Sequence, residues 1–196
     1  MRARALAVGG AWEFEPEVFP DDRGLFVSPF QREVFADAVG APLFAVAQAS
    51  ASVSRRGVAR GVHYARRAPG CAKYVTCSRG RVLDVVVDLR VGSPTFGEWD
   101  SVELSGDGFR AVYLPPGLGH AFLALEDHST VHYLLSRAYD PADELAVSLL
   151  DPDLALPVPA DAVLSERDRR APGLAHARDS GLLPVHTAPD REGSAE

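Results

Sequence analysis

Short runs of β-branched and aromatic residues, separated by turn-forming residues, recur along this chain from about residue 12 to 158. Examples are VLDVVVDLR (82–90), RAVYLP (110–115), HAFLAL (120–125) and TVHYLLS (130–136). Strands at intervals of about 8–12 residues with turn signals between them are typical of a β-sandwich or barrel. Because the chain has 196 residues, 46% of them hydrophobic, we predict one all-β domain with a sizeable core over residues 1–160.

Two segments show other patterns. In residues 28–40, Phe30, Val34 and Phe35 lie near helical spacing and Gly40 follows the last apolar residue, which predicts a helix. Residues 161–186 resemble turns and one or two short helices placed after the β-domain. The last ten residues, 187–196, are polar, and we expect them to be disordered.

The strand candidate at 82–90 has two different faces. Val82, Asp84, Val86 and Asp88 lie on one face, and Leu83, Val85, Val87 and Leu89 lie on the other. The apolar face must be core, either between sheets or against a partner. The mixed face fits either a solvated surface or the polar interior of a ligand-holding barrel, and the pattern leaves both open.

Charge and composition exclude several classes of protein. The net charge of −7 argues against an electrostatic nucleic-acid binder, which needs a basic face. No window approaches the roughly 18 apolar residues of a membrane helix, and the N-terminus lacks the features of a secretory signal. Cys71 and Cys77 are the only cysteines, which fits free thiols in a reducing cytoplasm. We therefore expect a cytoplasmic protein without nucleic-acid or membrane partners.

Two of the six histidines have a suggestive setting. The segment PPGLGH (115–120) matches the P-x-G-x-x-H turn of cupin barrels, in which the histidine begins a strand and points inward. His63 lies on an earlier strand that would occupy the matching place. A catalytic metal needs three or more ligands, and neither an H-x-H pair nor a suitably spaced glutamate accompanies these two histidines. We therefore predict no metal. Alone, a strand histidine is more often a core residue than a catalyst.

Seven motifs, in order and spacing, resemble those of the dTDP-4-dehydrorhamnose 3,5-epimerase family. They are DDRGLF (21–26), RGVHY (60–64), AKYVTCSRG (72–80), DVVVDLRVGSPTFGEW (84–99), LPPGLGHAF (114–122), YLLSRAYDP (133–141) and LSERD (164–168). The resemblance covers residues 12–184 and is closer to the branch that tailors deoxysugars for antibiotics. It implies a cupin-type double-stranded jelly roll with short flanking helices, and a homodimer that uses no metal or redox cofactor. Its substrate would be a dTDP-4-keto-6-deoxy sugar, with the segment 161–186 completing the site.

The resemblance also implies roles for individual residues. His63 matches the base that removes a proton next to the ketone, and Asp168 matches the carboxylate that orients this histidine. Lys73 matches the cation facing the enolate oxygen, a contribution that is often the largest in catalysis. Tyr133 matches the acid that returns a proton to the opposite face of the carbon. The implied substrate-binding residues are Arg23, Phe26, Gln48, Arg60, Asp84, His120 and Tyr139.

Some positions depart from the family pattern. Ser28, Ser50 and Val158 stand where a glutamate, an asparagine and a tryptophan are usual, and the first two bear on nucleotide contacts. Cys71 and Arg167 replace a glutamine and a lysine. None of these changes removes the base, its carboxylate, the lysine or the tyrosine.

The sequence therefore predicts an epimerase that inverts carbon 3, carbon 5 or both. Two alternatives stay open: a 3,4-ketoisomerase on the same scaffold, which would be expected to replace Tyr133, and a non-catalytic sugar-nucleotide-binding cupin, which needs no base. The residues do not choose between carbon 3 and carbon 5, because one base can serve both if the sugar ring turns.

Overall fold

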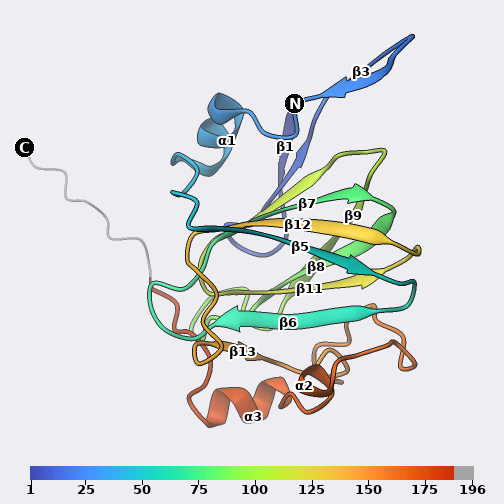
Figure 1. The fold of residues 1–196 in the computed structure, drawn as a ribbon. Coiled ribbons are helices and arrows are strands. Elements are labelled where there is room, and N and C mark those ends of the chain that lie inside the picture. The colour runs from blue at the N-terminus through green and yellow to red at the C-terminus, as the bar shows by residue number, and fades with distance from the viewer. Residues whose placement is uncertain (188–196) are drawn as a thin grey trace, which may run out of the picture.

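Two antiparallel sheets face each other in the computed structural model, which describes residues 1–187 (Figure 1). The six-stranded sheet has the order β1 (Arg2–Ala5), β2 (Trp12–Glu15), β10 (Ala111–Leu114), β7 (Lys73–Arg79), β12 (Ser129–Leu135), β5 (Gln48–Ser54). The five-stranded sheet has the order β13 (Glu144–Ala146), β6 (Ala59–Ala65), β11 (Leu118–Ala124), β8 (Arg81–Asp88), β9 (Trp99–Ser105). The predicted all-β jelly roll is confirmed. Of the segment expected to be disordered, residues 188–196 lie outside the described range.

A separate hairpin, β3 (Val18–Asp21) and β4 (Gly24–Val27), projects from the body next to the N-terminus (Figure 1). It pairs with neither large sheet. Its side chains Phe19, Leu25 and Phe26 are at least half exposed. The hairpin is therefore an apolar arm that a single copy of the chain leaves uncovered.

The mixed face of β8 points into the space between the sheets. Val82 and Val86 pack there against Val75 and Val131 of the six-stranded sheet, and Asp84 is 1% exposed on the same face. The polar-interior interpretation of this strand is therefore the right one, and the solvated-face interpretation is wrong.

The apolar face of β8 is covered by the C-terminal segment of the same chain. Val85 and Val87 pack against Leu149, Leu154 and Leu174, on the side where α2 (Glu166–Arg169) and α3 (Leu174–Asp179) lie in Figure 1. We expected this face to meet either the other sheet or a partner, and that expectation is wrong. The segment 161–186, for which the sequence predicts turns and one or two short helices, contains α2 and α3.

Helix α1 (Arg32–Val39) covers the outer face of the six-stranded sheet, as the pattern in residues 28–40 predicts. Phe35 is buried there and stacks on Phe14, with ring centroids 5.4 Å apart. The helix ends at Gly40, which has a φ of +79°. A left-handed residue just after the last turn is the usual helix C-terminus.

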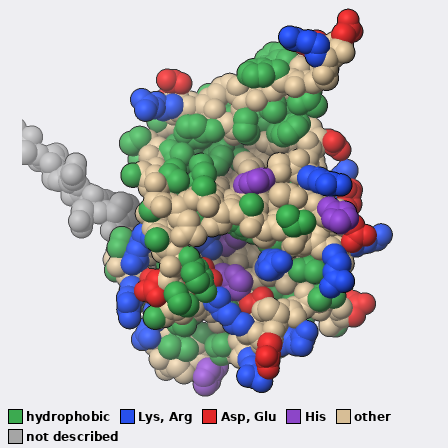
Figure 2. Space-filling model, viewed as in Figure 1, with side chains coloured by type: hydrophobic (Ala, Val, Ile, Leu, Met, Phe, Trp, Pro, Cys, Tyr) green, Lys and Arg blue, Asp and Glu red, His purple; other side chains and the backbone are tan. Residues whose placement is uncertain are grey.

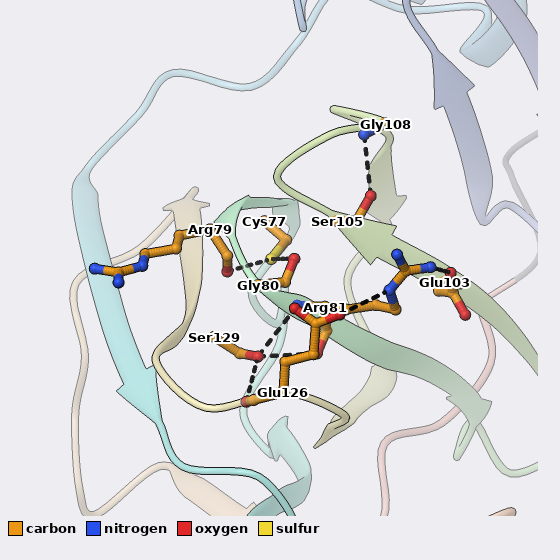
Figure 3. Close-up of polar contacts among 9 residues, drawn as sticks. All are labelled: Cys77, Arg79, Gly80, Arg81, Glu103, Ser105, Gly108, Glu126 and Ser129. Atoms are coloured by element: carbon orange, nitrogen blue, oxygen red, sulfur yellow. Dashed lines mark hydrogen bonds and ion pairs between the residues drawn. The ribbon is translucent and has the colours of Figure 1, made fainter.

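The tight turn between β7 and β8 carries the chain from one sheet to the other (Figure 3). Gly80 has a φ of +69° there, and a Cβ atom at this position would lie 2.7 Å from Ser129 Oγ. The amide of Arg81 donates to Ser129 Oγ (3.2 Å), and the Arg81 guanidinium pairs with Glu103 (2.6 Å). These contacts tie the start of β8 to β12 of the other sheet and to β9 of its own sheet.

Asp88, at the end of β8, is a buried but ionised carboxylate. Its Oδ2 accepts hydrogen bonds from the hydroxyls of Ser93 and Thr95 (both 2.6 Å) and pairs with Arg90 (2.7 Å). Burial by itself would raise the pKa of Asp88, but these hydrogen bonds outweigh burial and hold the pKa at about 2. The carboxylate thus anchors the loop that follows β8.

Replacing Asp88 with asparagine should lower the free energy of unfolding at pH 7 by about 2 kcal/mol. The folded-state pKa lies below the unfolded one, so this stabilisation is present above about pH 4 and is lost as the pH falls toward 2. Asp88→Asn should therefore also flatten the pH dependence in that window. Denaturant unfolding at pH 7 and pH 3 measures both effects.

The matched control is Asp179→Asn, which removes an exposed carboxylate whose ion pair, among the described residues, is with its neighbour Arg178. Its effect should stay within about 0.5 kcal/mol. Equal stability of Asp88→Asn and wild type at pH 7 would show that Asp88 is no anchor.

Candidate active site

A cavity of about 240 Å³ opens between the two sheets. Strands β5, β6, β7, β11 and β12 and the β12–β13 loop contribute its lining. In Figure 2, histidine, basic and acidic side chains gather around a hollow in the lower half of the visible face. Seven of the expected catalytic and substrate-binding residues line the cavity: Gln48, Arg60, His63, Lys73, His120, Tyr133 and Tyr139.

An irregularity in β6 brings Arg60 and His63 to the same side of the sheet. Residues three apart on a regular strand point to opposite faces. Here His63 is paired with His120 and Arg60 with Phe122, so Gly61 and Val62 together oppose Ala121 alone. Because of this β-bulge, the side chains of Arg60 and His63 both point to the cavity side of the sheet.

The bulge requires glycine at position 61. Gly61 has a φ of +134°, and a Cβ atom there would overlap the Cβ of Ala121. Gly61→Ala should therefore lower the free energy of unfolding by about 3 kcal/mol, from overpacking and backbone strain together. Calorimetric or denaturant unfolding measures this loss.

Gly57→Ala is the control for backbone strain alone. Gly57 has a φ of +81°, but a Cβ atom there meets nothing within 4 Å. Its substitution should lower stability by only about 1 kcal/mol. Equal losses in the two variants would contradict the close packing of β6 on β11.

His63 and Asp168 form a hydrogen-bonded pair, with His63 Nε2 2.7 Å from Asp168 Oδ1. Asp168 lies on the short helix α2, whose N-cap Ser165 accepts a hydrogen bond from the Asp168 amide. Burial by itself would raise the pKa of Asp168, but the hydrogen bonds from His63 and Ser165 outweigh it and lower the pKa. An ionised Asp168 accepts the Nε2 proton of His63, which leaves Nδ1 as an acceptor.

Lys73 is the first residue of β7, and its side chain is buried. Its Nζ lies 3.5 Å from the carbonyl oxygen of His63. Burial lowers the pKa of Lys73, and the nearby carboxylates of Glu144 and Asp84 oppose that shift. The amino group of Lys73 is therefore held next to the backbone of His63 with little water around it.

Tyr133 extends from β12, in the sheet opposite His63. Burial raises the pKa of Tyr133 to about 12, and a hydrogen bond with Ser52 (3.2 Å) opposes the rise. The ring of His120 packs edge-on against Tyr133, with centroids 5.8 Å apart. His63 and Tyr133 thus approach the cavity from opposite sheets.

Three of the expected substrate-binding residues lie elsewhere. Asp84 does not line the cavity; it lies behind His120 and contacts the Nε2 of that residue at 2.7 Å. Arg23 and Phe26 lie on the projecting β3–β4 hairpin, where Arg23 pairs with Asp21 and Phe26 is 66% exposed. A single chain therefore does not bring these two side chains to its own cavity.

Comparison with known proteins identifies the scaffold. Residues 5–176 match the family model described as dTDP-4-dehydrorhamnose 3,5-epimerase. The chain belongs to this family. A dTDP-4-dehydrorhamnose 3,5-epimerase of Mycolicibacterium smegmatis is 51% identical to it over 185 residues, which cover 94% of this chain and 92% of the relative.

Two solved structures of family members from Streptomyces superpose closely on the chain. One is NovW, a 4-keto-6-deoxy sugar epimerase from the novobiocin biosynthetic gene cluster of Streptomyces spheroides, with 52% identity, a TM-score of 0.91, and coverage of 95% of this chain and 94% of NovW. The other is ChmJ, a 3′-monoepimerase from Streptomyces bikiniensis in complex with dTDP-quinovose, with 49% identity, a TM-score of 0.87, and coverage of 93% and 92%.

Several residues that line or support the cavity were not predicted from the sequence. Glu144 forms an ion pair with Arg167 (3.1 Å), and Asp143 lies beside Arg137 (3.4 Å). Both acids lie where a polar loop meets the three-residue strand β13, so no periodicity marks them. Ser52, which does not line the cavity itself but contacts the hydroxyl of Tyr133, was missed as well, although its alternation with alanines on β5 was a usable signal.

Two further features of residues 1–187 bear on the kind of site and of protein. Within that range, no group of three or more histidine, cysteine or acidic side chains is arranged to hold a metal ion. None of the described helices has the length and apolar character needed to cross a membrane.

Proposed function

We propose that the protein inverts carbon 3, carbon 5 or both of a dTDP-4-keto-6-deoxyhexose by proton abstraction and return through an enolate. The observation that carries this proposal is the convergence of His63, Lys73 and Tyr133 on one cavity, with Asp168 hydrogen-bonded to His63 from behind. The dTDP-quinovose bound to ChmJ and the sugar epimerase activity of NovW support the same class of substrate.

His63 is the base. Its Nδ1 takes the proton from the carbon next to the ketone, and the resulting imidazolium is stabilised by the ionised Asp168 at 2.7 Å. Histidine suits this task because its unperturbed pKa lies near neutral pH.

Lys73 stabilises the enolate. When the proton leaves, negative charge develops on the oxygen at carbon 4, and a buried ammonium group is already in place to compensate it. No metal or redox cofactor is needed for this step, so extensive treatment with a chelator should leave the rate unchanged.

Tyr133 is the acid. It belongs to the sheet that faces His63, which supports delivery of a proton to the other face of the same carbon. Removal on one face and return on the other inverts the carbon. Arg60 at the mouth would bind the diphosphate, and Gln48, His120 and Tyr139 would contact the sugar or nucleoside.

One experiment separates this proposal from its rivals. A dTDP-4-keto-6-deoxyglucose substrate is incubated with the protein in D2O and followed by proton NMR. An epimerase yields inverted product with deuterium at carbon 3, carbon 5 or both. A 3,4-ketoisomerase yields a 3-keto product, and a binding protein yields no exchange; either result would overturn the proposal.

We also propose that the protein is a homodimer in which the β3–β4 hairpin of one copy reaches the cavity of the other. The hairpin carries Arg23 and Phe26 away from the cavity of their own chain, and its apolar side chains are exposed. A second copy would cover these side chains and give Arg23 a diphosphate to bind.

Mixed dimers test this arrangement. His63→Asn and Arg23→Ala variants are each expected to be weakly active or inactive, but after mixing and subunit exchange some dimers contain one intact site. Recovery of activity on mixing supports the proposal, whereas a monomer in sedimentation, or no recovery from exchanged dimers, contradicts it.

The free thiols Cys71 and Cys77 support a cytoplasmic setting for the protein. The likeness to NovW supports a role in antibiotic sugar biosynthesis.

A further inference from the structure

Strand β5 presents three serines to the cavity side of the six-stranded sheet. In the sequence QASASVS, the exposed Ala49, Ala51 and Val53 alternate with the inward-facing Ser50, Ser52 and Ser54. The register agrees, because Ser52 is paired with the interior residue Val131 of β12. Apolar side chains would also fit these three inward positions of an edge strand, but β5 has a hydroxyl group at each of them.

Each serine hydroxyl contacts a different residue of the site. Ser50 Oγ accepts a hydrogen bond from Gln48 Nε2 (2.8 Å), and Ser54 Oγ accepts one from Arg60 Nε (3.2 Å). Ser52 Oγ lies 3.2 Å from the hydroxyl of Tyr133. The three partners come from β5, β6 and β12, so the contacts connect one strand to both walls of the cavity.

We propose that the inner face of β5 is a positioning surface, on which Ser52 holds the Tyr133 hydroxyl for proton delivery while Ser50 and Ser54 hold the residues that bind the nucleotide end of the substrate. This inference rests on the proposed epimerase function. It assigns three separate positioning roles to adjacent inward positions of one strand.

Ser52 acts where charge develops. When Tyr133 gives up its proton, its oxygen becomes negative inside the cavity, where burial works against the ionised form. Within residues 1–187, Ser52 is the one side chain that hydrogen-bonds to this oxygen. A hydroxyl that donates to a forming phenolate makes a charge-assisted bond, which is about twice as strong as a neutral one.

Ser50 acts through Gln48. Because Nε2 of Gln48 donates to Ser50, its Oε1 faces the Tyr139 amide and accepts that proton at 2.9 Å. Tyr139 thereby has its backbone anchored at the cavity mouth. Ser54 acts in the same way on Arg60, whose guanidinium extends from the facing sheet.

Three single substitutions to alanine test the proposal on the full protein, with dTDP-4-keto-6-deoxyglucose in D2O. Ser52→Ala should slow inversion by about tenfold while KM and deuterium exchange into recovered substrate stay near the wild-type values. Ser50→Ala and Ser54→Ala should raise KM by about fivefold and leave the ratio of exchange to inversion unchanged.

Ser52→Thr, which keeps the hydroxyl, should restore the wild-type ratio, and melting temperatures confirm that each variant is folded. If Ser52→Ala does not fold, Ser52→Cys retains a weak donor and should shift the ratio in the same direction by less. A wild-type ratio in Ser52→Ala, or one common pattern in all three alanine variants, would overturn the positioning roles. A wild-type protein that exchanges no deuterium would instead overturn the proposed function.

Discussion

Replacing His63 with asparagine should slow both deuterium exchange and epimerisation by about 10⁴-fold, because no other group takes its place as the base. Asparagine is the informative replacement, since its amide can still donate to the buried Asp168 and so avoids leaving that carboxylate unpaired. The measurement is proton NMR of the substrate in D2O over hours, together with a melting curve.

The matched control for this variant is His176→Asn. His176 lies exposed on α3, outside the cavity, and its substitution should leave both rates unchanged. Exchange at the wild-type rate in a folded His63→Asn protein would mean that His63 is structural and that the base lies elsewhere.

Replacing Tyr133 with phenylalanine should separate two events that the wild-type protein couples. His63 can still remove the proton, because Lys73 still stabilises the enolate. Return of a proton from His63 regenerates the starting configuration with deuterium in place, whereas delivery to the other face loses its acid and slows by about 10²-fold. The variant should therefore label its substrate faster than it forms epimer, which NMR resolves in one time course.

A purely structural tyrosine predicts a different result. Removing its hydroxyl would then change stability through the contact with Ser52 and leave the ratio of exchange to inversion as in the wild type. Near wild-type epimerisation by folded Tyr133→Phe would mean that another group, such as Tyr139 or a water molecule, is the acid.

The strand β8 shows how far the sequence alone predicts the site. Alternation along 82–90 separated the two faces of β8 correctly, because that strand is regular and buried on both sides. It could not say what covers the apolar face, because Leu149 and Leu174 lie far along the chain in segments without a period.

Arg60 and His63 show the limit of periodicity most clearly. Strict alternation places them on opposite faces, and only the bulge at Gly61 reunites them. The family resemblance named both residues because it carries information about the folded site that local pattern lacks. It could also name Asp168, which is 105 residues from His63 and meets it only through α2.

Arg23 and Phe26 show the limit of a single chain. Their motif matches the family pattern, but neither residue lines the cavity of its own copy, and the hairpin that carries them projects from the body (Figure 1). A sequence motif specifies the residue types that a site requires without specifying which copy supplies them. The mixed-dimer experiment addresses that remaining step.

The central claim is that two different groups, His63 and Tyr133, act on opposite faces of one carbon. Substrate deuterated at the inverted carbon, converted in ordinary water and analysed by mass spectrometry after a fraction of a turnover, tests it directly. We expect the epimer to carry no deuterium, because the proton removed by His63 never reaches the face served by Tyr133. Epimer that retains the substrate's own deuterium would contradict it, because a single group would then be removing and returning the same hydrogen.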